Sequence, residues 1–155
     1  MLSTFFSFDF FVSFLMAAIG TVGFSLLFRS RAKYLLLLAI GGALTYAVYF
    51  FFEINIFKSV FAAAFFSSAF SAVYSEIFAR IKRAPAIIFL APCAIPIVPG
   101  SSLYYAMASL ISRDMEAALR HLTNAAVIGI GIAGGIMAVS ILVNIYMGIL
   151  KRHRA

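Results

Sequence analysis

A charge-free stretch from Ala84 to Ser112 contains the residues whose types and spacing best suit binding chemistry. Proline removes a backbone donor and clashes with the preceding turn, so Pro92, Pro96 and Pro99 predict that no continuous helix forms here. Lipid cannot satisfy the freed carbonyl groups, so a broken segment must be covered by protein or line a cavity that contains water. The stretch is therefore the first candidate for a binding site.

The residues after the last proline suggest what such a site would bind. Gly100 is expected to adopt a backbone conformation closed to other residues and to let a ligand approach the backbone closely, and Ser101 or Ser102 can cap a second helix. The free N–H groups at that new helix start carry partial positive charge and favour an anion such as a carboxylate. Hydroxyl contacts can come from two tyrosines. The candidate substrate-binding residues are Pro96, Pro99, Gly100, Ser101, Ser102, Tyr104 and Tyr105.

Two further groups of polar residues lie on the preceding segment. Glu76 is an ionisable residue close to a membrane segment, so it is a candidate proton carrier. Arg80 follows four residues later, and an ion pair that anchors the helix end is the favoured alternative. Ser67, Ser71 and Ser75 recur at four-residue spacing. Such a face favours close helix packing, and a polar path for substrate is the minority alternative.

The composition indicates which elements position these residues. Of 155 residues, 65% are hydrophobic and 11% are charged, whereas soluble domains have about 25% charged residues. The sequence predicts one all-α membrane domain over residues 1–155, a polytopic helix bundle in the lipid bilayer. Five spans are expected, at about 10–28, 34–52, 56–79, 84–112 and 122–150. The fourth is broken at Pro96–Gly100, and half-helix lengths put the break near the membrane midplane.

The positive charges indicate the orientation. The net charge of +7 falls in short clusters between apolar runs, which argues against a nucleic-acid partner. Nine cations fall on one side of a five-span chain: Arg29, Arg31, Lys33, Arg80, Lys82, Arg83, Lys151, Arg152 and Arg154. The positive-inside rule then places the N-terminus outside and the C-terminus in the cytoplasm of a cell (inner or plasma) membrane.

Small residues mark faces where helices can pack closely. Gly20 and Gly23 predict such a face on the first span, and Gly131 and Gly135 have the GxxxG spacing on the fifth.

Residues 112–121 are expected to form an amphipathic start to the fifth span. Ser112 is its expected N-cap, with Asp114 and Glu116 in the first turn. Asn124 and Asn144 are each expected to make a hydrogen bond between helices rather than to contact substrate.

The sequence does not favour an enzyme, a metal site or a bound cofactor. A nucleophilic serine needs a base nearby, but His121 lies about half a membrane from the break by helical rise. Phosphate-binding G-x-x-x-x-G-K-[ST], H-E-x-x-H and G-x-S-x-G patterns are absent from the sequence. An ion gradient is the expected driving force.

The stretch Ile95-Pro96-Ile97-Val98-Pro99-Gly100-Ser101-Ser102-Leu103-Tyr104-Tyr105-Ala106-Met107 resembles the signature of the threonine/serine exporter family. More narrowly, it is similar to the small-subunit branch associated with dicarboxylate (succinate) export. Residues 20–28, 41–44 and 75–86 also resemble segments of this family.

The resemblance implies export of small carboxylate-bearing metabolites together with a larger membrane subunit. The two subunits are then expected to form inverted repeats with substrate between them. A non-transporting scaffold subunit remains the alternative.

Overall fold

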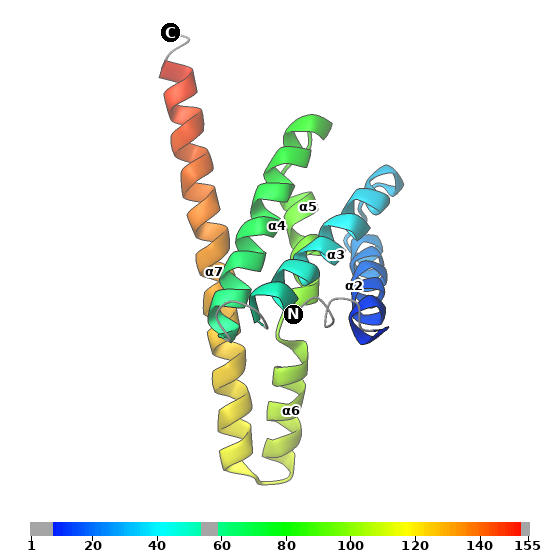
Figure 1. Ribbon diagram of the computed structural model, residues 1–155, viewed down its shortest axis with the longest axis vertical. Helices are drawn as coiled ribbons and strands as arrows, with labels where there is room; N and C mark the ends of the chain where they lie inside the picture. Colours follow the sequence, from blue (N-terminus) through cyan, green and yellow to red (C-terminus); the bar gives the residue numbers. More distant parts are fainter. Residues whose placement is uncertain (1–7, 54–58, 153–155) are drawn as a thin grey trace.

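The computed structural model describes residues 8–53 and 59–152, and its regular structure in these ranges is entirely helical (Figure 1). In chain order the elements are α2 (Phe8–Leu27), the 3-10 turn η1 (Ala32–Tyr34), α3 (Leu35–Phe51), α4 (Val60–Lys82), α5 (Ile87–Ala94), the 3-10 turn η3 (Ile95–Ile97), α6 (Gly100–Ile111) and α7 (Met115–Arg152). The predicted all-α class is confirmed.

Four helices are long and apolar enough to cross a membrane, and the count reaches five if the bent pair of residues 87–97 and 100–111 forms one span. This agrees with the predicted number of spans. The boundaries differ at the last span, which was expected to begin near residue 122. In the structure its lead-in and the span form one helix of 38 residues from Met115. The expected start of the third span, at residues 56–58, lies outside the described residues.

The buried core lies where α3, α4 and α5 meet. Its cluster consists of Tyr34, Leu38, Ala79, Phe89 and Cys93. Two contacts join neighbouring helices there: the Tyr74 hydroxyl donates a hydrogen bond of 2.7 Å to the carbonyl of Leu37, and the Cys93 thiol lies 3.8 Å from the carbonyl of Leu38. The first half of the broken span is therefore held firmly by its neighbours.

Glycines permit close helix contacts at two places. A Cβ atom on Gly41 would lie 2.5 Å from Cys93 Sγ and 2.6 Å from Tyr74 Cε1, and one on Gly42 would collide with Thr21 of α2. On α7, a Cβ on Gly131 would lie 2.9 Å from the carbonyl oxygen of Phe61. The predicted GxxxG contact is thus confirmed as packing of α7 against α4.

The expected packing face at Gly20 and Gly23 is wrong within this chain. A Cβ atom on either would have no atom within 4 Å, and both residues are exposed. The face of α2 that meets α3 instead carries Thr21, whose hydroxyl bonds to the carbonyl of Ala17 in its own helix at 2.7 Å.

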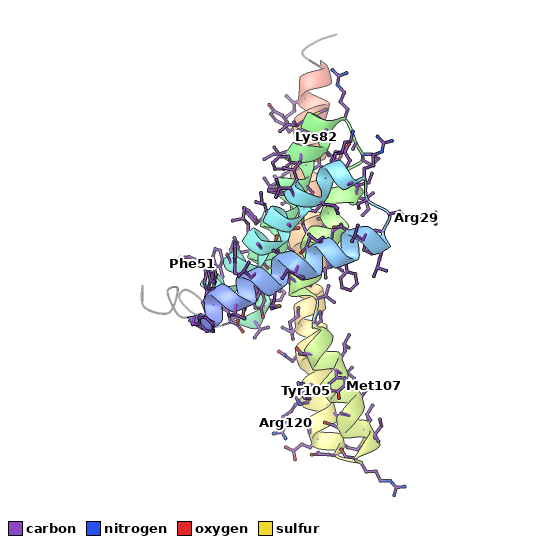
Figure 2. All side chains as sticks on the ribbon, turned by 90° about the vertical axis from the view of Figure 1, so that its right-hand side faces the viewer. Arg29, Phe51, Lys82, Tyr105, Met107 and Arg120 are labelled. Carbon is purple, nitrogen blue, oxygen red and sulfur yellow. The ribbon has the colours of Figure 1, made fainter. Side chains whose placement is uncertain are left out.

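The second half of the broken span is placed differently from the first. Among the described helices, α6 packs against α7 alone, whereas α7 also packs against α4. Figure 1 shows α6 and the first part of α7 as a hairpin that extends away from α2, α3 and α4. In Figure 2 this hairpin carries Tyr105, Met107 and Arg120 and lies below Arg29 and Lys82.

The turn of the hairpin corrects the expected N-cap. Asp114, not Ser112, caps α7: its Oδ1 accepts the backbone N–H of Ala117 at 3.0 Å. The Ser112 hydroxyl instead donates to the carbonyl of Ala108, in the last turn of α6, at 3.0 Å. Ser112 thus belongs to the end of one helix, and Asp114 starts the next.

Candidate functional site

The break between η3 and α6 is shorter than the prolines suggested. Pro92 lies inside α5, and Pro96 lies inside η3. Extended backbone is confined to Val98, with ψ 133°, followed by Pro99 with ψ 51°. The two helical pieces meet there at 53°. The predicted interruption is present, and it is concentrated at Val98 and Pro99.

The start of α6 leaves donors free, as the sequence predicted. The N–H of Gly100 bonds to the carbonyl of Val98 at 2.7 Å, and that of Leu103 bonds to Pro99 at 3.1 Å. Within the described residues, the backbone N–H groups of Ser101 and Ser102 have no acceptor. These two donors and the helix dipole form a positively polarised end that suits a carboxylate.

The expected cap is wrong, since neither serine side chain caps α6. Pro99 occupies the N-cap position without a side-chain bond. The hydroxyl of Ser102 is buried and accepts a hydrogen bond of 3.1 Å from Nδ2 of Asn124, on α7. This bond confirms the expected interhelix role of Asn124, whereas Asn144 is exposed and makes no such bond among the described residues. The amide takes the hydroxyl of Ser102 as its partner, so this side chain helps to fix α6 on α7.

The candidate residues of α6 divide between two faces of the helix. Ser102 faces α7, and the Tyr105 ring lies 5.6 Å from the His121 ring of α7 between centroids. Ser101 is exposed, and Tyr104 is 69% exposed. The structure thus brings Ser102 and Tyr105 to the hairpin interface and leaves Ser101 and Tyr104 on the outer surface.

Gly100 is open on its outer side. A Cβ atom there would have no atom within 4 Å, and no described glycine has a positive φ. The backbone of this position therefore does not require glycine, contrary to the role expected for it. Because glycine has no side chain, open space remains beside the free N–H groups of α6.

Three hollows stand out in the described part of the chain, and none of them is lined by Pro99, Gly100 or Ser101. One hollow of about 350 Å³ lies along α6 and α7 and is lined entirely by apolar residues such as Leu103, Met107 and Leu122. It offers no donor to a carboxylate. The free N–H groups at the break thus lie outside these three hollows.

The residues of α4 proposed for coupling or for a polar path are placed as follows. Arg80 Nη2 lies 3.4 Å from Glu76 Oε2, which confirms the predicted pair. Ser67 and Ser75 are buried and donate to the carbonyls of Ala63 and Ser71 in their own helix, each at 2.7 Å. Ser71 Oγ is buried without a partner among the described residues. These serines lie in packed surroundings and line none of the three hollows.

The structure also assembles a group of residues that sequence analysis used only for orientation. The turn between α2 and α3 and the turn between α4 and α5 lie together, and five cations from the two turns line one hollow. The sequence held one signal for this group: the basic clusters at residues 29–33 and 80–83 were expected on the same side of the membrane. Their contact could not be inferred, because it depends on how α5 folds back between α3 and α4.

An all-helical bundle with four or five candidate membrane spans, one of them broken, is the architecture of a multi-pass membrane protein. Broken helices of this kind recur in transporters. Comparison of the sequence with models of known protein families narrows this class. The family model described as "Threonine/Serine exporter, ThrE" matches residues 13–142. The chain belongs to this family of membrane exporters. The comparisons with curated proteins and with solved structures give no match.

Proposed function

We propose that this chain is the smaller subunit of a secondary exporter for small carboxylate-bearing metabolites, such as threonine, serine or succinate-like dicarboxylates. One observation carries the proposal: the broken span presents the free N–H groups of Ser101 and Ser102 at the start of α6, beside the open surface at Gly100. Broken helices that aim a positive end at an anionic group recur in secondary transporters.

The proposal includes a larger membrane subunit of the same family. The start of α6 is open among the described residues, and α6 has a single helical neighbour. A binding site at membrane depth needs protein around it, so the partner would close the site over Gly100. We place the two subunits as inverted repeats, with the N-terminus of this chain outside. Finding the partner's termini in the same orientation as those of this chain would contradict that arrangement.

A non-transporting scaffold is the second candidate function. The observation that favours it is that none of the three hollows lies at the break. A scaffold would use the hairpin and the helix faces for assembly, and its function would not depend on the open space at Gly100.

Efflux measurements distinguish the two functions. The chain is co-expressed with its candidate larger subunit, cells are loaded with serine, threonine or succinate, and efflux is compared for wild type, Gly100→Leu and Gly129→Leu. Both glycines face open space, so both variants should reach wild-type levels in the membrane. The exporter requires that Gly100→Leu loses efflux while Gly129→Leu retains it. Equal efflux from all three and from the empty vector would support the scaffold.

A further inference from the structure

The hollow between the two basic turns is a pocket whose charged lining residues are all cations. Its volume is about 550 Å³, within the range of about 300–1,000 Å³ typical of ligand sites. The connection between α2 and α3, which includes η1, contributes Arg29, Arg31 and Lys33, and the end of α4 with the turn after it contributes Lys82 and Arg83. Five positive charges from two chain segments therefore converge on one cavity.

The described part of the chain supplies no acid to balance these charges. Its two ion pairs, Arg80–Glu76 and Arg120–Glu116, involve none of the five cations. Lys33 makes a cation–π contact with the Tyr34 ring, at 5.0 Å from the ring centre. Like charges held together without counter-charges repel one another, so the pocket is suited to an external anion.

The pocket is apolar along its α5 wall. Ile87, Ile88 and Pro92 line that wall, and Phe28 lines the end of α2. Ile87 is 63% exposed and Phe28 is 58% exposed. The apolar wall therefore continues onto the outer surface of the helices, where lipid chains would lie. The charges come from turns between membrane-crossing helices, which is the level of lipid headgroups.

From this combination we infer that the pocket binds an anionic phospholipid, with the phosphate among the five cations and an acyl chain along α5. The positive-inside rule puts these turns at the cytoplasmic face, whose leaflet carries anionic lipids. A small soluble anion would use the charges but not the apolar wall. The bound lipid would neutralise the repulsion between the two turns and hold them together.

Substitutions in these turns can remove positive charge with little change in backbone conformational energy. Arg29 and Arg83 have φ of 52° and 50°, in the left-handed region that favours glycine. Arg29→Gly with Arg83→Gly therefore removes two pocket charges while relieving backbone strain. Arg113, with φ 61°, occupies the same kind of turn in the hairpin, outside the pocket. Arg113→Gly is the matched control.

The test uses the full chain purified in a neutral detergent, with lipid binding measured by native mass spectrometry during titration. Wild type and Arg113→Gly should bind phosphatidylglycerol at least tenfold more tightly than phosphatidylcholine. Each surface cation near an anionic lipid contributes about fivefold, so the double variant should lose about 25-fold for phosphatidylglycerol. Lys33→Gln with Lys82→Gln should weaken binding similarly without altering a left-handed position.

Equal affinity for the two lipids would overturn the inference, as would a loss in Arg113→Gly equal to that in the pocket variants. Tight binding of inorganic phosphate or succinate without retention of phosphatidylglycerol would also overturn it, because the ligand would then be a soluble anion. The readout is lipid retention and not efflux, so the result is independent of the proposed export function.

Discussion

Asp114 shows how much one side chain determines at the turn between α6 and α7. Arg113 takes a left-handed conformation at the end of α6, and the N–H of Asp114 then bonds back to the carbonyl of Ser109 at 2.9 Å. The Asp114 carboxylate is thereby placed to accept the N–H of Ala117 at the start of α7. One residue thus ends one helix with its backbone and starts the next with its side chain.

Asp114→Ala should lower the free energy of unfolding by about 1 kcal/mol, because the N–H groups at the start of α7 lose their acceptor. Ser112→Ala removes a hydroxyl that bonds only within the end of α6, so its effect should stay within about 0.5 kcal/mol. Thermal or denaturant unfolding of the purified chain in detergent measures both. A larger loss in Ser112→Ala than in Asp114→Ala would restore Ser112 as the functional cap.

At the scale of elements, the contact between α4 and α7 is the one that joins the hairpin to the bundle, since among the described helices α7 touches both α4 and α6. Gly131 and Gly135 lie against the backbone of Phe61 and Phe65 on α4. Close backbone approach is what stabilises helix pairs in lipid, where Leu-rich faces gain little from association.

Gly135→Leu should destabilise the chain by about 2 kcal/mol, because its side chain would collide with the Phe65 carbonyl and the Ser68 side chain on α4. Gly129→Leu, on an open part of the same helix, should leave stability close to wild type. The melting temperature in detergent compares the two. Equal melting temperatures for both variants would show that α4 and α7 do not meet through this face.

The helices and the break could be predicted from sequence because they follow from local chemistry: apolar runs between charges set the spans, and Pro99 lies where one of them is interrupted. Helix rotation could not be predicted. Gly20, Gly23, Gly41 and Gly42 are the same residue type, and only the contacts between helices decide which of them are buried.

The same limitation applied to the candidate site. Ser102 and Tyr105 are three residues apart and share the face of α6 that meets α7, and Ser101 and Tyr104 share another. If α7 had been known as the neighbour of α6, these four residues could have been assigned correctly to the buried and the outer face. The cap at Asp114 was missed because it depends on the left-handed backbone of Arg113, which arginine seldom adopts.

Across the whole molecule, the basic turns lie apart from the hairpin: in Figure 2 Arg29 and Lys82 lie well above Arg120. At 38 residues, α7 is about 57 Å long, roughly twice the hydrocarbon thickness of about 30 Å. Part of α7 therefore extends past the hydrocarbon layer or is steeply tilted in it.

Cysteine labelling should place the two ends on opposite sides of the membrane. Cys93 is fully buried, so the native thiol should not react and need not be replaced. With a membrane-impermeant maleimide added to intact cells, Ser112→Cys should be labelled and Arg31→Cys should not, because both positions are exposed but the basic turn is expected inside. After permeabilisation both should react. Protection of both in intact cells, with both reacting after permeabilisation, would show that the broken segment re-enters without crossing.

The unbroken course of α7 has a mechanical consequence. Long helices curve gently, and sharp kinks arise at proline, at glycine or serine pairs and at bulges. The helix α7 contains no proline and runs without a break, although it includes Gly134 and Gly135. We expect it to act as a lever whose pivot is the glycine contact on α4. A displacement of the hairpin at one arm would swing the other arm in the opposite sense. A partner that binds α6 would thus transmit its movement to the other end of α7 through this single helix.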